Sequence, residues 1–259
     1  MYKSFNVSID SDDFNDFLHA GQELHKNNKR IVCDTLDGFK GDDDKLVASK
    51  IVAEWFPEVQ ADVFLSHSHK DENSVIALSG WLKEEFGLTS FIDSCIWGYS
   101  EKLLKMIDDQ YCYDKKNEIY NYNKRNRSTS HVYMMLSTAL TGMIDRCEVV
   151  FFVNTPNSFS ADNYIESHGT TESPWIYSEL AMTRLVRTKK PEQHRQSYMI
   201  AEARDSMENY KDLNVEYHAD LSHLIPLSKF DLTSWWHANS ETGSKSLDAL
   251  YKQAVIYRG

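Results

Sequence analysis

The sequence predicts an α/β protein built on an open parallel sheet with helices on both faces. After residue 60, short apolar stretches alternate with stretches whose apolar residues recur at helical spacing. Residues 149–153 are apolar at every position, which is typical of a parallel strand covered on both faces. Residues 131–147 carry one long apolar stripe, which must pack against a sheet. In such a sheet, ligands bind beyond the carboxyl ends of the strands.

Composition narrows the classes of protein that the chain can belong to. With 259 residues and 41% hydrophobic content, it can bury one large core. The net charge of -11 and the pI near 5.4 disfavour a protein whose main task is to neutralise nucleic-acid phosphates, so no nucleic-acid partner is expected. No apolar run approaches the roughly 18 residues that cross a membrane. The four cysteines are widely separated in the sequence, and no leader peptide is expected. Both features indicate reduced thiols in a cytoplasmic protein.

The first 60 residues predict a small, mostly helical N-terminal extension that serves as a packing or dimerising arm. Candidate helices lie near residues 13–26 and 44–55. Residues 61–259 then form the main domain, which contains an inserted loop at about 111–130 without clear periodicity, either functional or merely tolerated.

The main domain is expected to alternate strands and helices in order. Gly87 ends the first of its helices, and a loop that holds Gly98 and Tyr99 follows the second strand. The expected strands are 63–66, 88–93, 148–154, 215–219 and 224–227, and the expected helices are 75–86, 101–109, 131–147, 173–187 and 246–257.

One acidic residue is out of place in this pattern. On a helical wheel of residues 173–187, Glu179 falls among Trp175, Ile176, Met182 and Val186. A carboxylate on an apolar face either pairs with a nearby cation or has a raised pKa, and the second case is common at functional sites. Helical spacing alone leaves both readings open.

Three motifs in this order resemble those of TIR domains. Residues 62–71, DVFLSHSHKD, resemble the family's first strand and the polar loop after it. Residues 88–93, LTSFID, resemble the second strand leading into the BB loop, and residues 173–180, SPWIYSEL, resemble a later helix with a Trp four residues before a Glu. The resemblance covers about residues 61–257 and implies a flavodoxin-like open parallel sheet.

The resemblance also implies site residues. Enzymatic TIR domains use the helix glutamate, here Glu179, to cleave NAD+, with Trp175 at the matching spacing. An aromatic residue of the BB-side loop stacks on the substrate, and Tyr99 occupies that position where Phe is more familiar. The loop after the first strand nominates three further substrate-binding residues, Ser66, His67 and Ser68. Some relatives carry Tyr-Arg at the last two positions, so the resemblance leaves their contacts open.

The function implied is that of an NAD+ glycohydrolase or ADP-ribosyl cyclase, with NAD+ as substrate rather than cofactor. Nicotinamide leaves as a neutral molecule, so one carboxylate can suffice for the reaction. Resemblance further implies self-association through TIR contacts, a resting form of low activity, and a role in bacterial antiphage defence with a downstream effector that senses the product. The alternatives are a non-catalytic TIR scaffold and an enzyme that cleaves nucleoside N-glycosidic bonds.

Other ligand signatures are weak or missing. His67, His69 and Asp71 lack a fourth ligand at a recognised spacing, so no metal site is expected. Neither a GxGxxG nor a GxxxxGK[ST] motif is present, which excludes a standard Rossmann fingerprint or P-loop.

Overall fold

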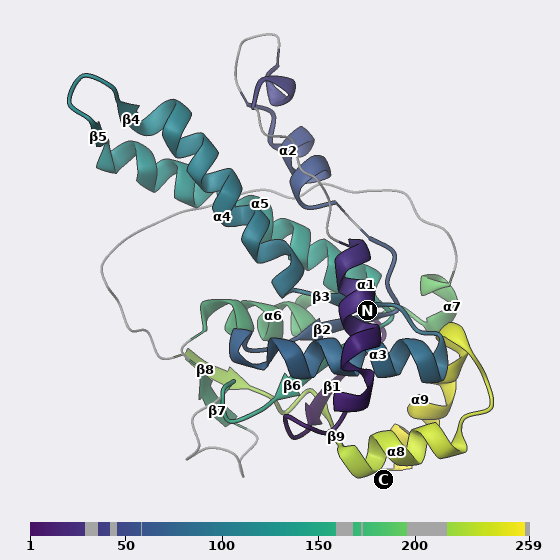
Figure 1. The fold of residues 1–259 in the computed structure, drawn as a ribbon. Coiled ribbons are helices and arrows are strands. Elements are labelled where there is room, and N and C mark those ends of the chain that lie inside the picture. The colour runs from purple at the N-terminus through teal and green to yellow at the C-terminus, as the bar shows by residue number, and fades with distance from the viewer. Residues whose placement is uncertain are drawn as a thin grey trace.

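A parallel sheet forms the centre of the molecule (Figure 1). The computed structural model describes residues 1–28, 36–41, 46–57, 59–158, 168–171, 173–195 and 217–256. Within these residues the sheet has five strands in the order β3-β2-β6-β1-β9, and all neighbours run parallel. The strands are β1 (Lys3–Ser8), β2 (Val63–Ser66), β3 (Ser90–Ile92), β6 (Val149–Asn154) and β9 (Ile225–Ser228). The predicted α/β class is confirmed.

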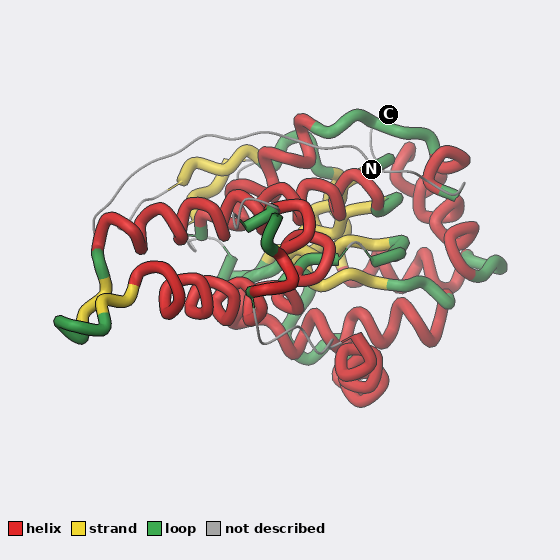
Figure 2. Tube along the Cα trace, turned by 90° about the horizontal axis from the view of Figure 1, so that it is seen from above, coloured by secondary structure: helices red, strands yellow, loops and turns green. Residues whose placement is uncertain are grey.

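Helices cover both faces of the sheet, as the view along its layers shows (Figure 2). Successive side chains of a strand point to opposite faces, so Val63 and Leu65 join one apolar cluster and Phe64 joins the other. The first cluster includes α3 (Glu72–Phe86), α8 (Lys229–Ala238) and α9 (Leu247–Ile256). The second includes α2 (Ala48–Trp55), α4 (Ser94–Ile107) and α5 (Tyr122–Arg146), while α6 (Pro174–Leu185) packs on Phe152 beside it.

The N-terminal segment is part of the sheet, which corrects the expectation of a mostly helical extension over residues 1–60. Strand β1 lies between β6 and β9, with Phe5 opposite both Phe151 and Ile225. Only two core positions, Phe5 and Val7, alternate in this short strand, so its periodicity is too weak to read from the sequence. The two helices expected in this segment are present as α1 (Leu18–Asn28) and α2.

With β1 set aside, the remaining strands follow the order second, first, third, fourth along the sheet. That order is compatible with a flavodoxin-like fold. The N-terminal strand occupies the position between the third and fourth of these strands. Every helix in the described parts of the chain is too short or too polar to span a lipid bilayer.

Two glycines allow helix α1 to cross α3 with the backbones in contact. A Cβ atom on Gly21 would lie 1.9 Å from the carbonyl oxygen of Ile76, and one on Gly80 would lie 2.3 Å from that of Phe17. Neither neighbour is a flexible side chain, so the helices would have to separate. The crossing attaches the N-terminal segment to the main body.

We expect Gly21→Ala to lower the free energy of unfolding by about 3 kcal/mol, because overpacking here displaces backbone rather than side chains. Urea unfolding followed by circular dichroism measures the change. Gly38→Ala is the matched control, since a Cβ at Gly38 meets nothing within 4 Å. Equal stability of the two variants would contradict the close crossing.

The predicted inserted loop at 111–130 is wrong, because this region is ordered secondary structure. A π-helical turn (Asp108–Cys112) continues α4, a hairpin of β4 (Tyr113–Asp114) and β5 (Ile119–Tyr120) follows, and α5 begins at Tyr122, nine residues before the predicted start. In Figure 1 the two long helices run side by side away from the sheet to this hairpin. We call residues 108–127 the arm.

Polar contacts rather than an apolar stripe hold the arm together. The Asp108 carboxylate accepts hydrogen bonds from Arg125 Nε at 2.8 Å and from the Ser128 hydroxyl. The Asn121 side chain caps α5 by accepting from the backbone N–H of Lys124 at 3.0 Å. Because these contacts have no hydrophobic period, the sequence pattern did not reveal the helices.

The remaining elements include a second antiparallel pair, in which β7 (His168–Thr171) lies beside β8 (Tyr217–Asp220). Strand β8 overlaps the expected strand 215–219, whose first two residues lie outside the described part, and β9 matches the expected strand 224–227. Helix α9 matches the expected closing helix, apart from residue 257, which is not described. The others are α7 (Pro191–His194) and the 3-10 turns Asn15–Phe17, Asp37–Phe39, His69–Asp71 and Gly243–Ser246.

Candidate functional site

Buried polar side chains gather where strands β2, β3 and β6 end. These are the carboxyl ends of parallel strands, where open α/β sheets bind ligands. The residues are Ser66, His67, Asp71, Asp93, Asn154, Thr155, Ser158 and Glu179, all of them less than 9% exposed.

Glu179 lies at the centre of this group. Helix α6 begins at Pro174, and the Ser173 hydroxyl accepts a hydrogen bond from the N–H of Ile176, as the sequence predicts for a capped helix with Pro in its first turn. Glu179 is 3% exposed, and its Oε2 accepts a hydrogen bond of 2.6 Å from the hydroxyl of Ser66 at the end of β2. Its Oε1 accepts no hydrogen bond from an N–H or O–H group of the described residues, and the carboxyl groups of Glu179 and Asp93 are hydrogen-bonding neighbours.

The environment of Glu179 favours the protonated carboxyl group. Burial raises its pKa well above the ordinary value, and the neighbouring Asp93 carboxylate raises it further, while the hydrogen bond from Ser66 acts in the opposite direction. No lysine or arginine contributes to the shift. Glu179 is 3% exposed and forms no ion pair with a lysine or arginine of the described residues, so the reading in which it pairs with a nearby cation is wrong, and the direction of the pKa shift favours the other reading.

His67 is the basic member of this group. It follows β2 and is 4% exposed, and its Nδ1 lies 2.7 Å from Asp93 Oδ1, at an ion-pair distance. Burial lowers the pKa of His67, yet the carboxylates of Asp93, Glu72 and Asp71 outweigh this and raise it. Asp93 also accepts from the N–H of Ser94 at 2.8 Å. Two carboxyl groups, a hydroxyl and an imidazole thus form one buried cluster.

A second set of hydrogen bonds joins the loops after β2 and β6. The buried Asp71 carboxylate accepts from the Thr155 hydroxyl at 2.6 Å and from Asn157 Nδ2 at 2.7 Å. The Ser158 hydroxyl donates to the carbonyl oxygen of Val153 at 3.1 Å. These bonds fix the loops beside the cluster and leave Asp71 no role as a free ligand.

The aromatic residues nominated from the sequence lie in the core beside the site. Trp175 and Tyr99 are both partly buried against the apolar cluster of α2, α4 and α5, and the Trp175 ring meets the Tyr133 ring edge-on at a centroid distance of 5.6 Å. Neither has a hydrogen bond or ring contact with Glu179 among the interactions described. Ser68 is half-buried at the start of the 3-10 turn, away from the pair formed by Ser66 and Glu179.

Tyr99 also lies on a different element from the predicted one. The expected loop around Gly98 and Tyr99 is wrong, because α4 begins at Ser94 directly after the second strand. The Asp93 side chain caps the helix at this point, which allows it to start without an intervening loop. Tyr99 is therefore held on a helix.

Asp93 is the residue in contact with Glu179 that the sequence prediction missed. It ends the stretch that resembles the second TIR strand, but its side chain was not nominated. The available signal was its position, since a carboxylate directly after a parallel strand lies at the ligand-binding edge. Its contact with Glu179 depends on β2 and β3 being neighbours, which spacing along the chain does not reveal.

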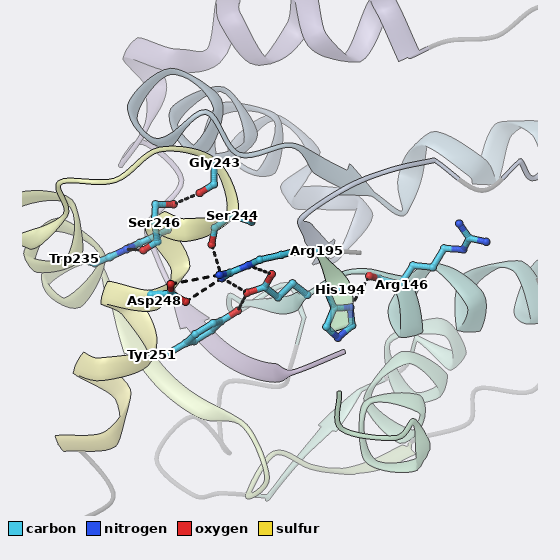
Figure 3. A network of polar contacts seen from close by, with 10 residues as sticks. Arg146, His194, Arg195, Trp235, Gly243, Ser244, Ser246, Asp248 and Tyr251 are labelled. Atoms are coloured by element: carbon cyan, nitrogen blue, oxygen red, sulfur yellow. Dashed lines mark hydrogen bonds and ion pairs between the residues drawn. The ribbon is translucent and has the colours of Figure 1, made fainter. Parts of the chain in front are cut away.

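A separate buried network lies at the opposite, amino edge of the sheet (Figure 3). Glu148, just before β6, is 2% exposed and receives bonds from Arg195 Nε at 3.0 Å, Arg195 Nη2 at 2.8 Å and the Tyr251 hydroxyl at 2.9 Å. Arg195 also pairs with Asp248 at 3.0 Å and donates to the Ser244 carbonyl at 2.8 Å. Both carboxylate oxygens of Glu148 have partners within the protein, so we interpret the network as structural.

Within the described residues, no three His, Cys, Asp or Glu side chains are placed to hold a metal ion. Comparison of the chain with protein families, with curated proteins and with solved structures finds no match. The site geometry and the sequence motifs therefore carry the functional argument.

Proposed function

We propose that this chain cleaves the bond between nicotinamide and ribose in NAD+, releasing nicotinamide with ADP-ribose or a cyclic ADP-ribose isomer. The observation that carries the proposal is Glu179, buried at the ligand-binding edge of the sheet, with one oxygen bonded to Ser66 and its carboxyl group beside that of Asp93. The resemblance of three motifs to TIR domains supplies the substrate. NAD+ is consumed and no cofactor is needed.

The chemistry suits a single glutamate. The nicotinamide ring carries a positive charge in NAD+ and leaves neutral, so the leaving group needs no proton. Positive charge then develops at the ribose C1′, where a carboxylate stabilises it. A bound pyridinium ring also favours ionisation of Glu179, because an opposite charge nearby lowers a raised pKa. Water as nucleophile gives ADP-ribose, and an atom of the same molecule gives a cyclic isomer.

The burial of Glu179 implies a resting form. A carboxyl group that is 3% exposed cannot reach a dinucleotide until the side chains covering it move. We propose that self-association through TIR contacts shifts the chain to an open, active form, by preferential binding to that form. Trp175, Tyr99, Ser66, His67 and Ser68 then face the substrate. In this proposal the enzyme acts in the cytoplasm of bacteria in antiphage defence, and a downstream effector senses its product.

The test is to incubate the concentrated protein with NAD+, and separately with nucleosides, and to separate the products by mass. Nicotinamide together with ADP-ribose or a cyclic isomer is the expected result. If NAD+ stays intact in samples that light scattering shows to be assembled, the result would favour the alternative function, a non-catalytic TIR scaffold. Cleavage of nucleosides with intact NAD+ would instead assign the nucleoside enzyme.

A further inference from the structure

The tip of the arm exposes an unusual set of aromatic side chains. Tyr111 and Tyr113 are each 38% exposed, Tyr120 is 42% exposed and Tyr122 is 61% exposed. The Tyr113 and Tyr120 rings face one another across the hairpin with centroids 5.0 Å apart. The Arg125 guanidinium lies 5.3 Å from the centre of the Tyr120 ring. The hairpin thus presents a connected surface of flat groups.

Local hydrogen bonds hold this surface in place. The Tyr120 hydroxyl donates to Asp109 at 2.5 Å, which ties the hairpin to the end of α4. The Asp114 carboxylate accepts from the N–H of Lys116 at 2.9 Å and from Asn117 Nδ2 at 2.8 Å, which closes the turn. Ordering the exposed rings before any ligand arrives lowers the entropy lost on binding.

Positive charge is concentrated on the same surface. The whole arm, residues 108–127, contains five lysines and arginines against four acidic residues, and beyond Asp108 and Asp109 the five cations stand against two acidic residues, in a chain of net charge -11. Four of these cations are exposed and form no ion pair with any described residue: Lys115, Lys116, Lys124 and Arg127. The charge of the whole chain therefore averages an acidic body and a basic tip.

The tip is far enough from the body for its own charge to govern binding. Helix α5 begins at Tyr122, and its first residue in the apolar core is Val132, ten residues later. Ten residues correspond to about 15 Å of helix, which separates the tip from the core. The Debye length at physiological ionic strength is about 8 Å. The acidic body is thus largely screened at the tip, so the net charge of -11 no longer argues against a polyanionic ligand there.

We propose that the tip of the arm binds single-stranded nucleic acid. Exposed tyrosine rings stack on bases, and the unpaired lysines and arginine bind the phosphates between them. Single strands fit because their bases expose flat faces, whereas those of a duplex are already stacked. Tyrosine and arginine are also enriched at protein interfaces, but the three lysines of the tip favour nucleic acid over a protein partner, because lysine is depleted at such interfaces. This site is separate from the proposed NAD+ site and does not depend on it.

The test is fluorescence anisotropy with labelled oligonucleotides of about 20 deoxythymidines or uridines, titrated with full-length protein over a range of salt concentrations. We expect binding that weakens with salt. In Lys115→Gln/Lys124→Gln the slope of log affinity against log salt should fall by about 1.4, because about 0.7 is lost per phosphate contact. The matched control is Lys83→Gln/Lys252→Gln, two exposed lysines of the body, and it should bind like the wild type.

A second pair of variants separates stacking from charge. Tyr122→Ala should weaken binding about tenfold, whereas Tyr122→Phe, which keeps the ring, should retain the affinity. Three outcomes would overturn the proposal: no binding of either oligonucleotide at low salt, heparin binding as tight as that of the oligonucleotides with no effect of Tyr122→Ala, or an equal loss in both lysine pairs. If the arm variants bind the oligonucleotides like the wild type but change the oligomeric state of the protein in solution, the tip would instead be a contact with a second copy of the chain.

Discussion

Replacing Glu179 with Gln is expected to slow NAD+ cleavage by about a hundredfold to a thousandfold. The substitution keeps the size of the side chain and an oxygen that can accept from Ser66, so the site remains packed. It removes the negative charge that acts on the positive charge developing at C1′, and one such electrostatic contact is worth about 10²–10³ in rate. Chromatography of released nicotinamide at matched protein concentrations measures the effect.

Glu148→Gln is the matched control for this prediction. Glu148 is also a buried glutamate whose pKa is raised, chiefly by burial, but it lies at the amino edge of the sheet. Its replacement should leave the rate of NAD+ cleavage unchanged in samples that remain folded. Undiminished turnover in Glu179→Gln, or equal losses in both variants, would rule out Glu179 as the working carboxylate.

The same substitution should raise stability in a pH-dependent way. The unfolded Glu179 ionises above its ordinary pKa of 4.5, whereas the folded chain holds the proton to higher pH. The folded state thus binds more protons between these two values, so the free energy of unfolding falls as pH rises through that window. An uncharged glutamine at this position has no such loss. We expect a gain of about 1 kcal/mol at pH 8 and no difference at pH 4.

Thermal unfolding of both proteins across this pH range measures the effect. A Glu179→Gln variant that is less stable than wild type at pH 8 would mean that Glu179 is ionised and fully satisfied in the fold. The substitution would then lower both the stability and the activity of the protein. The opposite movement is typical of a site where a buried charge is kept for function at the expense of stability.

Features that depend on neighbouring residues in the chain were predictable from the sequence. The apolar strand at 149–153, the long stripe that became α5, and the end of α3 at Gly87, whose φ is 68°, all follow from local spacing or backbone preference. Strand β1, the arm and the start of α4 were not predictable in this way. Each depends on a partner distant in sequence or on a polar contact, such as the bond of Arg125 to Asp108.

In the candidate site, too, local features were predictable from the sequence and contacts between distant residues were not. The burial of Glu179 follows from the helical wheel, since its neighbours at that spacing are apolar. Its partners do not follow, because Ser66 and Asp93 come from two strands whose adjacency only the fold establishes. His67 was nominated for substrate contact, yet its closest contact in the cluster is Asp93. Periodicity can locate an unusual residue, but only the topology of the sheet identifies its neighbours.

Arg195→Met is expected to lower the free energy of unfolding by about 3–5 kcal/mol at neutral pH. Arg195 gives two hydrogen bonds to Glu148, and that carboxylate is too deeply buried for water to replace them. Removing one partner of a buried pair leaves an uncompensated charge, which costs far more than the pair itself contributed. Methionine keeps most of the length and apolar volume, so the loss reports on charge. Urea unfolding at pH 7 measures it.

The double variant Arg195→Met/Glu148→Gln distinguishes this cause from a loss of packing. With the buried charge removed as well, most of the lost stability should return, because glutamine can still accept the Tyr251 hydrogen bond. The free energy of unfolding of Arg195→Met should also approach that of the wild type near pH 4. Burial already raises the pKa of Glu148, and protonation removes its charge. A deficit that persists in the double variant and at low pH would instead assign the role of Arg195 to its contacts with Asp248 and Ser244, which hold α9 and the turn before it.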